Sequence, residues 1–173
     1  MANGPHPEFS RVVPLTRVGA EPFRREIAAT EAERAALARR FDLVALDRLS
    51  ATVELARERG GTILLRAEFA AEFAQNCIVT LDPVPGLLRE SFALRYGPPE
   101  KEPEAALGSD DEPAFEPLEG EAIDIGEAVA QEFSLALPLF PRAGGVAVED
   151  GAADAGPRDG PFAALARRGR PGH

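Results

Sequence analysis

The chain has 173 residues, 45 % of them hydrophobic, and a formal net charge of −10 at pH 7, which together predict one globular domain of ordinary size. It contains no apolar run of about eighteen residues, which excludes a transmembrane helix, and its first residues lack the pattern of a signal peptide. We therefore expect a cytoplasmic protein.

Charge is unevenly distributed along the chain. Residues 1–98 carry 13 Lys and Arg against 13 Asp and Glu, residues 99–133 carry 1 against 12, and residues 134–173 carry 5 against 4. A neutral body with one acidic segment is a poor match to a phosphate backbone, which proteins bind through Lys and Arg. The distribution disfavours nucleic-acid binding through bulk charge, but not through a local group of arginines.

The first segments read as two short strands and a helix. Residues 9–15 and 23–27 are extended candidates separated by a Gly and Pro turn, which indicates a hairpin or two edge strands. Thr30 is a helix N-cap, because Glu33 stands at the capping-box position three residues later. We expect this helix to run to about Phe41 and to lie on the surface of a sheet.

From residue 43 the hydrophobic period changes to two. Apolar residues alternate with polar ones along residues 63–73 after a Gly60-Gly61 turn, and the alternation resumes at 77–81. Pro83 and Pro85 interrupt the pattern, and residues 92–96 form a last strand. One apolar and one polar face per strand is typical of an antiparallel sheet covered on one side.

An acidic connection then leads to a second helix. Residues 97–116 carry four prolines and dense acid, which is typical of a flexible linker. Asp124 caps a helix that Pro138 ends, and its apolar stripe is expected to pack on the sheet or, as the functional alternative, to enter a partner's groove. Residues 143–173 are expected to be a mostly disordered tail, with a possible short helix near 161–168.

Catalytic and ligand-binding patterns are absent from the sequence. The only two histidines lie at positions 6 and 173, and neither a phosphate-binding loop nor a dinucleotide fingerprint occurs. The pair Asp110-Asp111 is expected to be solvated charge. Cys77 is a lone cysteine on the inward set of a strand pattern, where a thiol packs as a small hydrophobe. We expect no enzyme activity, no metal and no cofactor.

Arginines of the N-terminal body are the candidate RNA contacts. Arg24, Arg25, Arg57 and Arg59 could converge on one surface. Acidic neighbours such as Glu54 leave an ordinary mixed-charge surface as the alternative.

The order and the amino-acid sequences of these segments resemble those of the YceD family, bacterial and plastid proteins described as large ribosomal RNA subunit accumulation proteins. The similarity begins with EFSR at 8–11, continues with AEFAAEFAQNCIVTLDPV at 67–84, and is most specific in EPLEGEAIDIGEAVAQEFSLALPLFPR at 116–142. The segment PFAALARR at 161–168 looks like alphaproteobacterial members. The residues that carry the family signature are Asp124, Gly126, Glu127, Pro138 and Cys77.

The resemblance implies a non-enzymatic accessory factor in ribosome biogenesis, which supports accumulation of large-subunit (23S) ribosomal RNA. Its partner would be that RNA, a basic ribosomal protein or an assembly intermediate. Many members carry Cys-x-x-Cys where this chain reads Cys77-Ile78-Val79-Thr80. One thiolate is too few for tetrahedral zinc, so metal dependence is not carried over.

Taken together, the sequence predicts a single α+β domain over residues 8–142. An antiparallel sheet, open or barrel-like, would be packed by two main helices. If the acidic segment contacts a basic protein, Glu116, Glu119 and Glu121 are the candidate contacts. The alternative function is a small acidic protein-interaction module unrelated to ribosomes.

Overall fold

The computed structural model describes residues 7–99, 112–118 and 120–142, all within one unit that spans residues 1–143. No helix in these described segments is long and apolar enough to cross a membrane. The elements follow in the order β1 (Val12–Pro14), η1 (Leu15–Arg17), β2 (Phe23–Ala28), α1 (Glu31–Arg40), β3 (Ala45–Arg57), β4 (Ile63–Asn76), β5 (Pro83–Gly97), β6 (Ala114–Pro117), β7 (Ala122–Asp124) and α2 (Ile125–Ala136).

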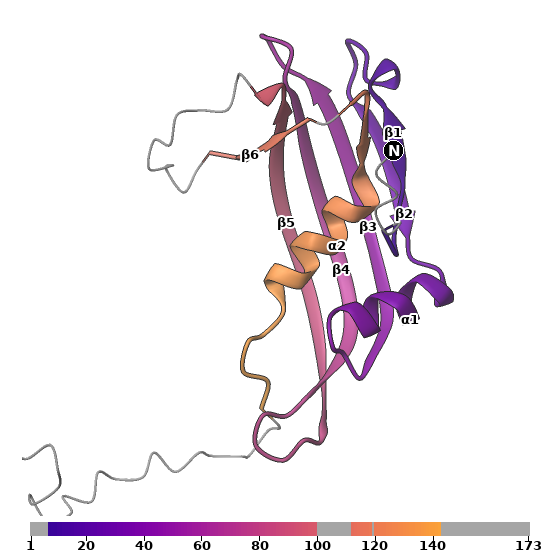
Figure 1. The fold of residues 1–173 in the computed structure, drawn as a ribbon, viewed down its shortest axis with the longest axis vertical. Helices are drawn as coiled ribbons and strands as arrows, with labels where there is room; N and C mark the ends of the chain where they lie inside the picture. Colours follow the sequence, from indigo (N-terminus) through magenta and orange to yellow (C-terminus); the bar gives the residue numbers. More distant parts are fainter. Residues whose placement is uncertain (1–6, 100–111, 119, 143–173) are drawn as a thin grey trace, which may run out of the picture. The chain divides into compact units, whose positions relative to one another are not determined.

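Five strands form the main sheet, in the order β2-β3-β4-β5-β6 (Figure 1). The pairs from β2 to β5 are antiparallel, whereas β6 joins β5 in parallel. Strands β1 and β7 form a separate antiparallel pair. The prediction of an α+β domain with two main helices agrees with this arrangement. The β1-β7 pair is a small second sheet that was not predicted, and the main sheet is mixed rather than purely antiparallel and open rather than barrel-like.

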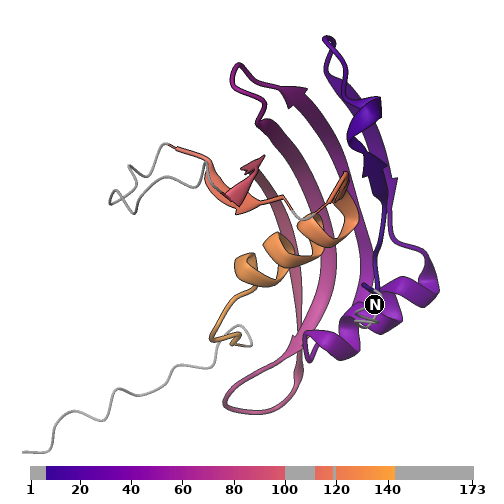
Figure 2. The same cartoon turned by 45° about the horizontal axis from the view of Figure 1, so that its top comes forward.

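The two faces of the main sheet differ, because side chains alternate along each strand. On one face the register aligns Val53 of β3, Ala67 of β4 and Phe92 of β5. Both views of the fold show α2 crossing this face, which we call the helix face (Figures 1 and 2). The other face carries the row of Thr52, Glu68 and Ser91, and in the described residues no helix covers it. We call it the open face.

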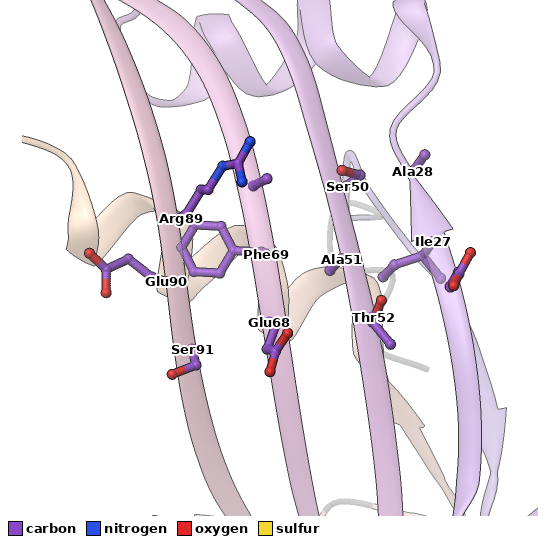
Figure 3. Close-up of a pocket in the computed structure, with 12 residues that line it drawn as sticks. Ile27, Ala28, Ser50, Ala51, Thr52, Glu68, Phe69, Arg89, Glu90 and Ser91 are labelled. Carbon is purple, nitrogen blue, oxygen red and sulfur yellow. The ribbon is translucent and has the colours of Figure 1, made fainter.

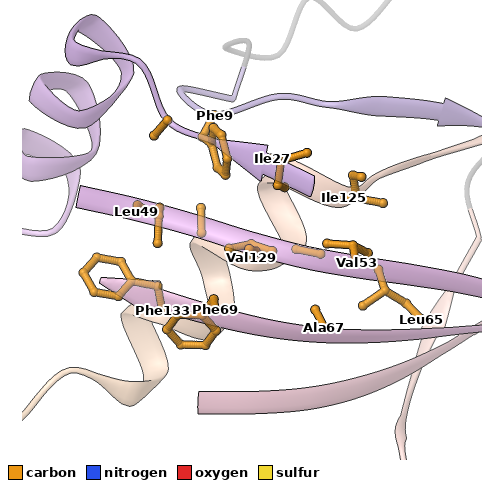
Figure 4. Packing of buried hydrophobic residues seen from close by; sticks show 14 of the residues in the cluster. Phe9, Ile27, Leu49, Val53, Leu65, Ala67, Phe69, Ile125, Val129 and Phe133 are labelled. Atoms are coloured by element: carbon orange, nitrogen blue, oxygen red, sulfur yellow. The ribbon is translucent and has the colours of Figure 1, made fainter. Parts of the chain in front are cut away.

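Helix α2 supplies the central part of the core. Ile125, Val129 and Phe133 recur at helical spacing and are fully buried against the sheet (Figure 4). The Phe133 ring meets Phe69 and Phe73 of β4 edge-on, with centroids 6.3 and 5.7 Å apart. The helix ends where predicted, one residue before Leu137 and two before Pro138. Docking of the stripe on the sheet is therefore confirmed.

Helix α1 also forms as predicted. The Thr30 hydroxyl accepts from the Glu33 amide, and the Glu33 carboxylate accepts from the Thr30 amide, which completes the capping box. Leu37 is its buried residue, and Phe41 beyond its end meets Phe133 edge-on. A thin apolar side is enough because the helix covers only one end of the sheet.

Of the two predicted arrangements of the first two strands, the hairpin is wrong, whereas two edge strands agree with the structure. Residues 12–14 pair with β7 in the register Val13↔Ile123, and β2 pairs with β3 in the register Arg25↔Val53. Both partners are distant in sequence, so the turn between the strands does not determine the pairing.

The predicted course of residues 77–85 is also wrong. Residues 77–82 are a turn rather than a strand, in which Cys77 is buried while Ile78, Val79 and Leu81 are exposed. Strand β5 starts at Pro83, although prolines were expected to interrupt it. The Gly97 carbonyl accepts a hydrogen bond from the Leu118 amide beside β6, so the backbone groups of Gly97 point away from β4. Because these directions alternate along a strand, every second residue counted back from Gly97 points the same way, and Pro85 is one of them. A missing amide there costs no ladder hydrogen bond.

The end of the predicted linker is partly ordered. Residues 114–117 form β6, which was not expected within the linker assigned to 97–116. Parallel pairing with β5 supplies backbone hydrogen bonds that composition does not reveal. The remaining linker residues, 100–111, and the tail, 143–173, lie outside the described residues.

Candidate functional site

Asp124 joins the helix start to the N-terminal segment. Its Oδ1 accepts hydrogen bonds from the amides of Gly126 (3.1 Å) and Glu127 (3.2 Å), which is the N-cap contact. The same oxygen accepts from the Arg11 amide at 2.7 Å, and Oδ2 accepts from the Ser10 hydroxyl. Both carboxylate oxygens are therefore occupied within the fold, and Asp124 acts as a structural clamp between residues 8–11 and 123–127.

Gly126 allows this clamp to close. A Cβ at this position would overlap the carbonyl oxygen of Phe9 and would lie 3.0 Å from the Arg11 amide. Phe9 itself is fully buried in the core that α2 covers (Figure 4). The close approach of two backbones requires a residue without a side chain.

Arg40 ties the same two segments to α1. Its guanidinium forms two hydrogen bonds with the Glu127 carboxylate, at 2.7 and 2.9 Å, and one with Glu8 at 2.9 Å. The Glu127 hydrogen bonds, followed by that of Glu8, raise the pKa of Arg40. The Glu127 carboxylate is consequently bound by Arg40 of α1 and, through Oε1, by the Gln131 side chain of α2.

Arg11 forms a second internal ion pair. It binds both oxygens of Glu33, at 2.7 and 2.9 Å, and also donates to the Ala28 carbonyl. The hydrogen bond from Arg11 lowers the pKa of Glu33 to about 2. Of the signature motifs, the EFSR and IDIGE segments thus meet each other and α1, and their polar groups hold the fold together.

The four candidate RNA-contact arginines do not share one surface. The register places Arg24 on the open face, opposite Glu54, and Arg25 on the helix face, opposite Val53. Arg57 donates to the backbone carbonyls of Leu15 and Val18. Arg59 is exposed in the turn between β3 and β4. The structure therefore separates residues that are close in sequence.

The candidate acidic contacts lie on the approach to α2. Glu116 is exposed on β6 and Glu121 is exposed before β7, whereas Glu119 lies outside the described residues. The sequence did not single out Glu132, which α2 brings close to Glu116. Burial, and then the negative charge of Glu116, raise the pKa of Glu132.

Tyr96 of β5 lies in the same acidic group. Burial, followed by the charges of Glu116, Glu132 and Asp124, raises the pKa of its hydroxyl. In the described part of the chain, no cation pairs with Glu116 or Glu132. The sequence shows Glu132 beside the apolar Phe133 on the second helix. It does not show that Glu116 lies near Glu132, because that depends on the pairing of β6 with β5.

The open face of the sheet is hollowed in its centre. A hollow of about 750 Å³ lies over β2 to β5, and Figure 3 shows the residues that line it on these strands, with α2 behind them. Small residues such as Ser50, Ala70 and Ser91 form its floor. The charged side chains of Arg89 on β5 and Glu68 on β4 also line it. The mixture of both charges gives this hollow no preference for a phosphate-rich ligand.

Cys77 and Pro138 support the end of the sheet nearest the turn of residues 77–82. Cys77 is buried, as the packing interpretation predicted, and its amide donates to the Asp82 carbonyl at 2.8 Å. The Pro138 carbonyl accepts from the Gln75 side chain at 3.3 Å. Together with the bond from the Ile78 amide to the Pro141 carbonyl, these contacts fix the segment after α2 against the turn.

One comparison with known proteins identified a relationship. A family model described as large ribosomal RNA subunit accumulation protein YceD matches residues 65–166, which is more than half of the chain. The match begins in β4 and includes the IDIGE segment, whereas residues 8–64 precede it. No curated protein and no solved structure gave a significant match.

Proposed function

Because the chain belongs to the YceD family of large ribosomal RNA subunit accumulation proteins, we propose that it is a non-enzymatic accessory factor of ribosome biogenesis. It acts in the cytoplasm and supports accumulation of large-subunit RNA by binding an assembly intermediate, through the RNA or through a basic ribosomal protein. The family match is the observation that carries this proposal.

The chemistry of the described residues supports binding rather than catalysis. Glu33 and Arg40, two of the groups with strongly shifted pKa values, are engaged in ion pairs that join segments of the fold. A general acid or base must exchange a proton with a substrate in a pocket, whereas the Glu33 carboxylate and the Arg40 guanidinium are held in internal ion pairs. The acids without a described cation, Glu116 and Glu132, are available for a partner instead.

Sedimentation of the chain with ribosomal particles tests the proposal. After brief cross-linking in cells, a tagged chain is expected to migrate with large-subunit precursors on a sucrose gradient. Recovery only with free protein at the top of the gradient would contradict it, and would favour the alternative of an interaction module unrelated to ribosomes.

Two sets of variants separate RNA from protein as the direct partner. Replacing Glu116, Glu119 and Glu121 by Gln is expected to abolish binding to a basic ribosomal protein and to leave binding to free RNA unchanged. Replacing Arg24, Arg25 and Arg59 by Gln is expected to weaken RNA binding and reduce its salt dependence, if RNA is the direct partner. Arg57 is kept because its guanidinium binds backbone carbonyls.

A further inference from the structure

Strand β5 has a long outer edge that its neighbour covers only in part. It runs from Pro83 to Gly97 and pairs with β4 throughout, but β6 pairs only with residues 94–97. Over residues 83–93, no strand in the described segments occupies the other side of β5. Unpaired edges of this kind accept a further strand from another polypeptide.

The direction of each backbone amide and carbonyl of β5 shows which of them face away from β4. The Gly97 carbonyl accepts from the Leu118 amide beside β6, and the β4 register is continuous from residue 97 back to residue 83. Because amide and carbonyl directions alternate along a strand, odd-numbered residues of β5 point outward. Among the described residues, the outward groups that remain for a partner are the amides and carbonyls of Leu87, Arg89 and Ser91 and the amide of Ala93, because the Leu94↔Ala114 pairing with β6 uses the Ala93 carbonyl.

Both ends of this free edge are defined. Pro85 has no amide to donate, and β6 occupies the edge from Leu94 onward. The span between them is about 20 Å, or roughly seven residues of an extended strand. Leu87 on the open face is 60 % exposed and offers apolar contact to the added strand.

Charge on the helix face indicates the partner's chemistry. Glu90 lies in the Phe69 row of that face, and Figure 3 shows its carboxylate extending past the outer edge of β5. Glu132 precedes Phe133, whose ring meets Phe69, so it lies in the turn of α2 next to this row. After burial, the negative charge of Glu116 is the second cause that raises the pKa of Glu132, so these two carboxylates are close together. None of these three carboxylates has a cation partner among the residues described.

We propose that the outer edge of β5, from Leu87 to Ala93, binds an extended basic segment of a partner protein as an additional strand. Backbone hydrogen bonds hold the segment, and its alternate Lys or Arg residues on the helix face meet Glu90, Glu116 and Glu132. This inference rests on the proposed function, of which it names the partner class. A phosphate backbone would face the same carboxylates and be repelled.

Amide hydrogen exchange of the full chain, resolved by NMR, tests the edge directly. In the free protein, the amides of Leu88, Glu90 and Phe92 are expected to be protected by β4, while those of Leu87, Arg89, Ser91 and Ala93 exchange rapidly. The probe is a ten-residue peptide of alternating Lys and Val. It is expected to protect the four outward amides, whereas the same peptide N-methylated at alternate residues does not.

Variants distinguish backbone pairing from charge attraction. Ser91→Pro removes one outward amide without touching the β4 ladder and is expected to weaken peptide binding about tenfold. Glu90→Gln combined with Glu132→Gln is expected to weaken it by a similar factor and to reduce its salt dependence. The control pair Glu21→Gln and Glu31→Gln carries the same charge change away from the edge and should bind like the wild type.

Several results would overturn the inference. Protection of the four amides in the free chain would mean that another segment of this chain, or a second copy, already covers the edge. Peptide binding that leaves the four amides unprotected, or their protection by a ten-nucleotide RNA instead, would equally refute it. Because this assay uses no ribosomes, its failure would leave co-sedimentation with large-subunit precursors intact, and the two proposals fail separately.

Discussion

Replacing Asp124 tests whether the clamp between the N-terminal segment and α2 has the energetic weight that its contacts indicate. In Asp124→Ala, the helix loses its cap, which costs about 1 kcal/mol. The contacts with the Arg11 amide and the Ser10 hydroxyl are also lost, and a hydrogen bond to a charged group contributes about 1.5 kcal/mol or more. We therefore expect the free energy of unfolding to fall by about 4 kcal/mol.

Asp124→Asn is the matched control for this change. It keeps one acceptor oxygen for the amides of Gly126, Glu127 and Arg11, so it should cost only about 1 kcal/mol. Urea unfolding at neutral pH measures both values, and an unchanged m value confirms that the same transition is compared. A loss below about 1.5 kcal/mol in Asp124→Ala, or equal losses in both variants, would refute the clamp.

Two further predictions concern the same region. Gly126→Ala should lower the free energy of unfolding by about 2–3 kcal/mol because its Cβ overlaps the Phe9 carbonyl, whereas Gly19→Ala, with open space around it, should be neutral in the same urea titration; equal effects would contradict the close approach. Glu33 has a pKa lowered from 4.5 to about 2 in the folded chain, so its stabilising effect is present above its ordinary pKa and is lost as the pH falls toward 2. Glu33→Gln should therefore cost about 1–2 kcal/mol at pH 7 after allowance for solvent screening, and the difference from wild type should vanish between about pH 5 and pH 2; a difference that is independent of pH would contradict the Arg11 pair.

Local sequence signals predicted the helices and the central strands. Thr30 with Glu33 and Asp124 with Pro138 mark helix ends through groups within a few residues of each other, so position along the chain is enough to read them. The alternation along residues 63–73 likewise reports burial on one face of a strand. These are the elements whose determinants are local.

Pairings between distant segments could not be read in this way. The partner of β1 is β7, more than 100 residues later in the register Val13↔Ile123, and nothing near residue 13 encodes that choice. Pro83 and Pro85 were predicted to interrupt the strand. The strand accommodates them because both face the outer edge of β5, where β4 needs no amide, and the sequence does not show which edge they face. The alternating residues Val79 and Leu81 are exposed in a turn, which shows that apolar alternation alone does not make a strand.

The candidate site was predicted only in part. The family-signature residues Asp124, Gly126 and Glu127 were identified, but their roles follow from contacts with residues 8–11 and with Arg40. The arginine group was proposed from closeness in sequence, whereas adjacent residues of a strand point to opposite faces. The acidic group around Glu132 and the free edge of β5 depend on where β6 pairs, which no local pattern reveals.

The abundance of large-subunit RNA relative to small-subunit RNA, in cells from which the gene for this chain is deleted, tests the central claim most directly. We expect this ratio to fall, with a depleted large-subunit peak on a sucrose gradient, and to recover when the wild-type chain is restored. An unchanged ratio and unaltered peaks would contradict a role in large-subunit RNA accumulation.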